Sequence, residues 1–130
     1  MSTVFSKIIS GEIQSHKIAE NENYLSFLDI NPLAEGHALV IPKKETDNIF
    51  DMTDDDLSGL ILFAKKVAKA IKSSIPCAKV GVSVIGLEVA HAHIHLIPID
   101  TVSDMNFSKD KLSPSNTELE QTANKIKRLI

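Results

Sequence analysis

Three histidines at alternate positions constrain this chain more than any other feature of its sequence. They are His91, His93 and His95, and their neighbours within Val89–Pro98 are mostly small or apolar. Alternation with a period of two is typical of a β-strand, because successive side chains of an extended chain point to opposite faces. The spacing therefore predicts a strand over Val89–Pro98, with one apolar face to bury and one face that carries three imidazole groups.

The three rings can converge on one small ligand, since neighbouring imidazoles on a strand face lie roughly 7 Å apart along the backbone. The apolar face would consist of the residues beside them: Ala92, Ile94 and Leu96. Three interpretations stay open on spacing alone. The row can be a solvated strand face, a zinc site completed by a third ligand and water, or a covalent catalyst in which one imidazole attacks and its neighbours orient it or supply a proton.

The run His91–Ile97 resembles the alternating His and apolar pattern that names the histidine-triad (HIT) family. Two other segments resemble the same family. Phe5–Ile13 is similar to its opening segment, and Leu25–Lys43 is similar to its nucleotide-binding strand, loop and next strand. The resemblance covers about residues 4–100, in the same order and spacing, and the tail beyond it has no counterpart.

The resemblance implies an α+β fold: a five-stranded antiparallel sheet with a long helix, pairing as a homodimer into a continuous ten-stranded sheet. The distribution of predicted strands and helices agrees with that class. We expect one domain over residues 1–130, with a C-terminal helical extension at about 113–130.

Periodicity and turn residues predict the individual elements. A helix over Val4–Ile9, capped by Ser2 or Thr3, would end at Gly11. The expected strands are Lys17–Glu20, Tyr24–Leu28, His37–Ile41, Lys79–Val84 and Val89–Pro98, the last two joined by a hairpin turn at Ile85–Glu88. A long helix after Thr53 would bury Leu57, Leu60, Ile61, Ala64, Val67, Ala68 and Ile71. A final helix over Ser115–Ile130 would bury Leu119, Ala123, Ile126 and Ile130.

The resemblance also assigns chemistry to the histidines. His93 would attack the α-phosphorus of a nucleotide and form a nucleotidyl-enzyme that water then hydrolyses. His95 would hold a non-bridging phosphate oxygen, and His91 would orient the ring of His93. His37 occupies the matching position on another strand and is expected to belong to the same network.

Asp29 is the expected ribose ligand, because a carboxylate can accept hydrogen bonds from both vicinal hydroxyls. Taken alone, it also fits a turn cap before Pro32. The remaining expected nucleotide contacts are an apolar slot for the base and two residues before the triad: Phe5, Ile8, Phe27 and Ile30, and Glu88 and Val89. The ligand would be a purine nucleotide resembling AMP.

Two departures from the family pattern modify these expectations. Family members often bind structural zinc through two cysteines and a histidine, where this chain has Thr3, Ser6 and Glu45. Without thiolates we expect no metal and no cofactor. The chain also has Leu87 and Glu88 where many members have Gln and a phosphate-binding hydroxyl, so the usual phosphate contacts are in doubt.

The net charge of −3 argues against nucleic acid as a partner. No secretory or membrane-spanning pattern is visible, and the single cysteine fits a reducing compartment, so we expect a cytoplasmic protein. The predicted function is a metal-independent nucleotide hydrolase or transferase that cleaves purine nucleoside phosphoramidates or related adenylates. The alternatives are a dinucleoside polyphosphate hydrolase, a nucleotide-binding protein with little turnover, and a zinc-dependent protein.

Overall fold

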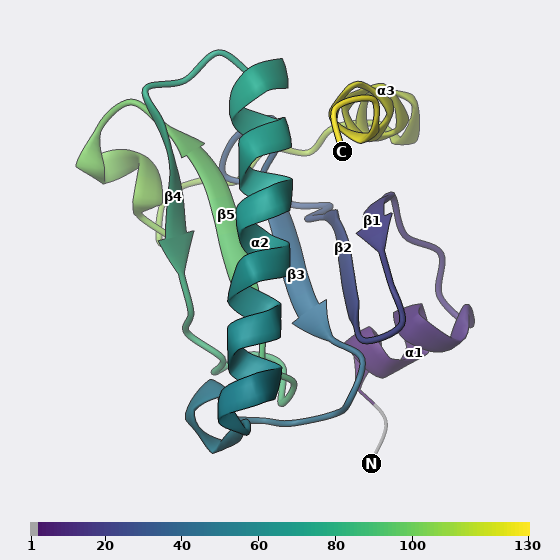
Figure 1. Ribbon diagram of the computed structural model, residues 1–130. Coiled ribbons are helices and arrows are strands. Elements are labelled where there is room, and N and C mark those ends of the chain that lie inside the picture. The colour runs from purple at the N-terminus through teal and green to yellow at the C-terminus, as the bar shows by residue number, and fades with distance from the viewer. Residues whose placement is uncertain (1–2) are drawn as a thin grey trace.

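A five-stranded antiparallel sheet organises the computed structural model, which describes residues 3–130 (Figure 1). The strand order is β1-β2-β3-β5-β4. The elements are α1 (Val4–Ser10), β1 (Lys17–Glu20), β2 (Tyr24–Leu28), β3 (Ala38–Pro42), the 3-10 turn η1 (Ile49–Asp51), α2 (Asp54–Ser74), β4 (Lys79–Ser83), β5 (Ile94–Ile99), the 3-10 turn η2 (Val102–Met105) and α3 (Asn116–Lys127). The predicted α+β class and five-stranded antiparallel sheet are confirmed.

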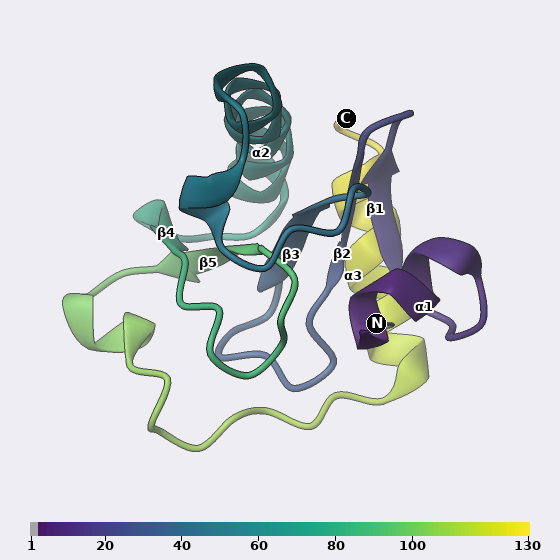
Figure 2. The same ribbon diagram turned by 90° about the horizontal axis from the view of Figure 1, so that it is seen from below.

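The two faces of the sheet are covered differently. The long helix α2 lies along one face, whereas α1 and the chain between η2 and α3 lie on the other side (Figure 2). Thr3 caps the start of α1, where its hydroxyl accepts a hydrogen bond from the Ser6 N–H, and Gly11 caps the end in the left-handed conformation. Thr3 is thus the cap, and Ser2, the other expected cap, lies outside the described residues.

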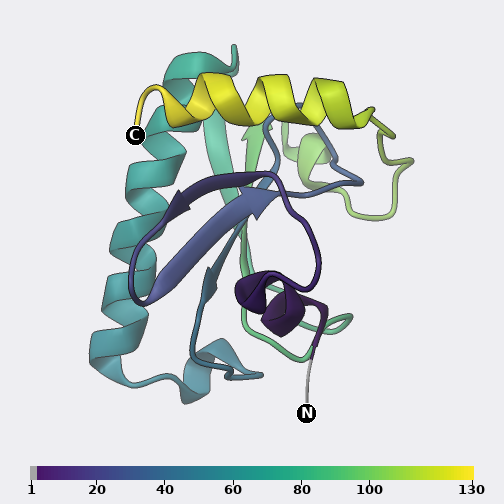
Figure 3. The same ribbon diagram turned by 90° about the vertical axis from the view of Figure 1, so that its right-hand side faces the viewer.

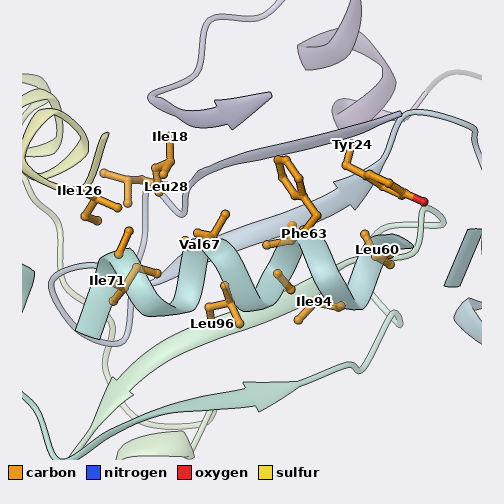
Figure 4. Close-up of a cluster of buried hydrophobic side chains, with 14 of the residues drawn as sticks. Ile18, Tyr24, Leu28, Leu60, Phe63, Val67, Ile71, Ile94, Leu96 and Ile126 are labelled. Atoms are coloured by element: carbon orange, nitrogen blue, oxygen red, sulfur yellow. The ribbon is translucent and has the colours of Figure 1, made fainter. Parts of the chain in front are cut away.

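The α2 face forms the main hydrophobic core (Figure 4). Thr53 caps α2, and three aspartates follow in its first turn, where the helix dipole favours negative charge. The buried stripe differs in part from the predicted one. Ile61 is 48% exposed, while Phe63, which was not predicted to be buried, packs in the core. The core also receives the expected apolar residues beside the histidines: Ala92, Ile94 and Leu96.

The strand that carries the triad begins later than predicted, at Ile94 instead of Val89. Its partner β4 ends at Ser83, and the two strands pair antiparallel as expected. The predicted four-residue turn at Ile85–Glu88 is wrong, because residues 84–93 form the connection.

The late start of β5 follows from its neighbour β3, which ends at Pro42. Proline has no N–H to continue a hydrogen-bond ladder. The last paired residues are Val40 and Ile94, and the Ala92 N–H instead donates to the Thr46 carbonyl at 2.7 Å. His91 and His93 therefore lie in an irregular segment. The apolar residues that alternate with them, Ala92 and Ile94, nevertheless still point into the main core.

The C-terminal helix α3 lies across the ends of α2 and the β1–β2 pair (Figure 3). Leu119, Ala123 and Ile126 join the main core as predicted. The helix ends at Lys127, so Ile130 leaves the periodic face and is exposed, contrary to expectation. Within residues 3–130, no helix combines the length and hydrophobicity needed to cross a bilayer.

Candidate active site

Strand register brings the candidate residues together on the face opposite α2. Leu39 pairs with His95 across β3 and β5, and the Asp29 N–H donates to the His37 carbonyl at 3.0 Å just beyond the β2–β3 pairs. Side chains two residues apart share a face, so His37 lies diagonally beside His95. Gly36 sets the chain into β3 with a φ of +92°, and a Cβ there would meet the Ile75 side chain at 2.9 Å.

His37 and His95 form a hydrogen-bonded pair whose protons can be assigned. The Leu33 N–H donates to His37 Nδ1 at 3.0 Å, so that nitrogen is an acceptor. A neutral His37 ring then carries its proton on Nε2 and donates it to His95 Nδ1 at 2.9 Å. Consequently the neutral His95 ring carries its proton on Nε2.

His93 is held in the opposite tautomer. Its Nδ1 lies 2.8 Å from the His91 carbonyl oxygen, which only accepts, so Nδ1 donates and the neutral ring keeps a lone pair on Nε2. His91 is fixed in turn, because its Nε2 donates to the Pro42 carbonyl at 2.7 Å. The ring centroids of His93 and His95 are 5.0 Å apart. The site therefore presents a lone pair beside an N–H donor.

Burial keeps two of these rings neutral. It lowers the pKa of His37 to about 3, and the charges of His95 and Lys111 act in the same direction. Burial also lowers the pKa of His95 to about 4, with a contribution from His93. At pH 7 both rings are uncharged, as the hydrogen-bond assignment requires.

The two carboxylate oxygens of Asp29 face different partners. One oxygen accepts from the Asn31 N–H at 2.9 Å, which caps the turn, and the other lies 3.7 Å from His37 Nε2. Burial raises the pKa of Asp29, and this N–H opposes the rise. The carboxylate thus has one oxygen directed towards the histidines.

Most of the expected base-binding residues form a small apolar cluster against α1. Phe5, Ile8 and Phe27 are buried there, and Val89 packs against them. The Phe5 ring lies 4.9 Å from that of His93 in an edge-to-face arrangement, so the cluster borders the histidines.

The other two expected contacts lie outside this cluster. Ile30 is 60% exposed, and Glu88 is exposed in the connection before the triad. The structure therefore brings His37, Asp29 and the apolar cluster to the triad, but leaves Glu88 on the surface.

Two of the residues at the family's zinc positions, Thr3 and Ser6, make hydrogen bonds to each other. The Thr3 N–H donates to Ser6 Oγ at 2.7 Å, and the Ser6 N–H donates to Thr3 Oγ1 at 3.1 Å. Thr3 Oγ1 also lies 3.5 Å from His91 Nδ1. These hydroxyls replace the thiolates that zinc would need.

One cluster among the described residues has the composition of a metal site: Asp29, His37 and His95, whose ligand atoms lie within 4.8 Å of one another. A metal needs a lone pair on His37 Nε2. That nitrogen carries the ring proton, however, because Nδ1 already accepts from Leu33. The donor set fits a hydrogen-bonded histidine pair better than a metal.

The tail supplies two residues that the sequence reasoning missed. Residues 106–114, here called the C-terminal strap, run along the face opposite α2 (Figure 2). Phe107 places its ring 4.9 Å from that of His95, and the charge of Lys111 acts on Asp29 and His37. No periodicity marks these residues, so no pattern in the sequence signalled them.

Known proteins share both the sequence and the fold. A model of the HIT domain matches residues 10–102. The adenosine 5'-monophosphoramidase of Saccharomyces cerevisiae is 42% identical over 96 residues, which are 73% of this chain and 61% of that protein.

Two crystal structures are similar over almost the whole chain. A Hit-like protein involved in cell-cycle regulation from Bartonella henselae has a TM-score of 0.85 and 31% identity, covering 99% of this chain and 97% of that one. A zinc-bound histidine triad family protein from Mycobacterium smegmatis has a TM-score of 0.81 and 27% identity, covering 99% and 93%. With its triad, its sheet and these matches, the chain belongs to the HIT domain family.

Proposed function

We propose that the protein is a nucleotide hydrolase or transferase that cleaves the α-phosphate linkage of purine nucleoside phosphoramidates through a nucleotidyl-His93 intermediate. The observation that carries the proposal is the pair of opposite tautomers, a lone pair on His93 Nε2 beside an N–H on His95 Nε2. A phosphoryl group needs a nucleophile and a donor for its oxygens. The related adenosine 5'-monophosphoramidase of yeast supports this choice of substrate.

In the first step, His93 Nε2 attacks the α-phosphorus and a P–N bond to the ring forms. The bond from phosphorus to the leaving amine breaks, and the amine takes a proton from water. The imidazole gains positive charge, which the His91 carbonyl stabilises through the Nδ1–H at 2.8 Å. His95 Nε2–H holds a non-bridging oxygen as negative charge develops there.

His95 serves as a fixed donor rather than as a proton relay. If its Nε2–H were transferred, His95 Nδ1 would have to take the Nε2 proton of His37, whose other nitrogen accepts from the Leu33 amide and whose Nε2 faces only the Asp29 carboxylate at 3.7 Å, an acceptor when ionised. A backbone amide does not release its proton at neutral pH. In the second step, water attacks the phosphorus, the bond to His93 breaks, and the nucleoside monophosphate leaves.

The rest of the nucleotide would lie between the histidines and α1. Asp29 would accept the ribose hydroxyls with the oxygen that the turn leaves free. Phe5 packs against the His93 ring and would contact the base together with the other residues of the apolar cluster and its neighbours: Ile8, Phe27, Val89 and Ile30. An apolar slot discriminates mainly by contact area, so purines would be preferred modestly.

A second candidate within the same chemistry is hydrolysis of dinucleoside polyphosphates. A third is nucleotide binding with little turnover, favoured by Glu88, whose carboxylate replaces a phosphate-binding hydroxyl and repels an anion. Glu88 is exposed, so it can turn away from the phosphate. We therefore retain catalysis as the proposal.

We also propose a homodimer in which two β4 strands extend the sheet. In the described part of the chain, β4 pairs with β5 alone, which leaves its outer backbone groups without a strand partner. Val82, Val84 and Ile85 are exposed on and after this edge. Light scattering would give twice the chain mass, and a monomer at micromolar concentration would contradict this proposal.

The decisive experiment uses adenosine 5'-phosphoramidate labelled in the phosphate, in the presence of a chelator. The bond between phosphorus and histidine breaks in acid but persists at alkaline pH. The labelled protein is therefore quenched and digested at alkaline pH, and the labelled peptide is identified. We expect the label on His93, and His93→Asn to lose at least about 10⁴-fold in kcat/KM. His16→Asn is the matched control, because His16 directly precedes β1 and is not among the candidate site residues. Wild-type turnover by His93→Asn would contradict the mechanism, and loss of activity in chelator would contradict metal independence.

A further inference from the structure

The C-terminal strap lies outside the matched HIT domain, which ends at residue 102. It nevertheless reaches the histidines. The Phe107 ring lies 4.9 Å from the His95 ring at an interplanar angle of 70°, and 6.3 Å from the His37 ring at 79°. Both contacts are edge-to-face arrangements, which aromatic rings favour at these separations. One side chain from the tail thus covers the hydrogen-bonded pair.

Two contacts hold the C-terminal part of the strap and the helix that follows it against the segment between β2 and β3. The Leu112 N–H donates to the Pro32 carbonyl at 2.9 Å, in the same loop as Asp29. Beyond the strap, Lys125 of α3 forms an ion pair at 2.7 Å with Glu35, which lies two residues before His37. These contacts hold the later part of the strap against the loop, and the ring contacts of Phe107 with His95 and His37 place its own side chain over the pair.

We propose that Phe107 is a positioning residue for the reaction, holding the His37–His95 pair in a single orientation and excluding water from it. This inference rests on the proposed function. The bond at 2.9 Å between the two rings is the link that places the His95 Nε2–H beside His93. Removing the cover would let water compete for His37 Nε2–H and let the His95 ring rotate, which misaligns the donor.

Four ionisable side chains near the His37–His95 pair could also change its protonation. Asp29 follows β2, His93 precedes β5, Lys111 belongs to the strap, and Glu88 lies in the connection before the triad. Substituting Phe107 leaves all four in place. A change in the titration of His95 in such a variant would therefore report the loss of cover rather than the loss of a charge.

The test compares Phe107→Ala with Phe107→Leu, which keeps an apolar cover, and with Phe50→Ala on η1, where the ring is 85% exposed. Histidine NMR titrations and pH profiles of kcat and KM are recorded for each. In Phe107→Ala we expect the pKa of His95 to rise from about 4 towards 6.5. The acid limb of kcat should shift upward, kcat at pH 7 should fall about tenfold, and KM should stay within about twofold.

We expect Phe107→Leu to restore most of kcat and Phe50→Ala to match the wild type. A His95 titration and a kcat profile unchanged in Phe107→Ala would overturn the inference. If that variant does not fold, Phe107→Gln gives the same comparison at similar side-chain length. The NMR titration needs no substrate, so it separates the two proposals. A raised His95 pKa in Phe107→Ala, combined with no turnover by the wild-type protein, would refute the proposed function and leave the covering role of Phe107 intact.

Discussion

The two faces of the sheet hold their side chains by different means. On the α2 face, Leu96 and Ile94 are fixed by close packing in one continuous apolar core (Figure 4). On the opposite face, His95 and His93 are fixed by directed hydrogen bonds that run to backbone groups of Leu33 and His91. Neighbouring residues of one segment therefore serve stability on one side and chemistry on the other.

The difference shows where substitutions are tolerated. Packing is not directional, so a core side chain can be replaced by another of similar volume at small cost. A hydrogen-bonded imidazole has two distinct nitrogens, and a replacement that keeps the volume loses the tautomer. We therefore expect substitutions on the histidine face to lower activity, and substitutions on the α2 face to lower stability.

The largest separation is expected at His95. His95→Ala should lower kcat by about 10²–10³-fold, because a donor aimed at developing charge is removed. Its unfolding free energy should change by less than about 1 kcal/mol, since water can enter the space that the ring leaves and accept from His37. Steady-state kinetics and urea unfolding measure the two effects. A destabilised but fully active variant would break the comparison.

The complementary change is Leu96→Ala, one residue further along β5. Leu96 is 1% exposed, so the substitution leaves a cavity and should cost about 2–5 kcal/mol of unfolding free energy. The kcat of the folded fraction should stay within about threefold. Urea unfolding gives the first value, and kinetics at a temperature well below the transition gives the second. A large loss of kcat would show that the faces are coupled.

The histidine face should also give stability a pH dependence. His37 and His95 have pKa values of about 3 and about 4 in the folded chain, below the 6.5 of a free imidazole. Below about pH 6.5 the unfolded chain takes up protons that the folded chain does not. Stability should therefore fall as the pH drops from 6.5 towards 4, and His95→Gln should flatten this dependence. Equal slopes in the two proteins would contradict the assignment.

The smallest expected effect lies at the start of α1. Thr3→Ala removes the hydroxyl that accepts from the Ser6 N–H and should cost about 1 kcal/mol of unfolding free energy. The helix carries Phe5 to the histidines, so KM should rise slightly while kcat is retained. Thermal unfolding and KM measure this, with Ser73→Ala on the exposed side of α2 as the control. A kcat loss like that of His95→Ala would place Thr3 in the chemistry.

Alternation in the sequence predicted which side of the sheet each residue of the triad segment takes, because that property is local. It did not predict that the β3–β5 ladder stops at Val40 and Ile94, since pairing depends on the partner strand. The resemblance indicated His37 and Asp29 as members of the site. Phe107 was missed, because an irregular tail has no period and its contact with His95 is fixed only by the folded chain.

The tautomers of the histidines can be measured directly by long-range ¹H–¹⁵N correlation of the imidazole nitrogens at pH 7. The expected result is a proton on Nδ1 of His93 and protons on Nε2 of His37 and His95, as the hydrogen bonds require. A proton on Nε2 of His93 would contradict the account, because the nitrogen that should attack phosphorus would then have no lone pair.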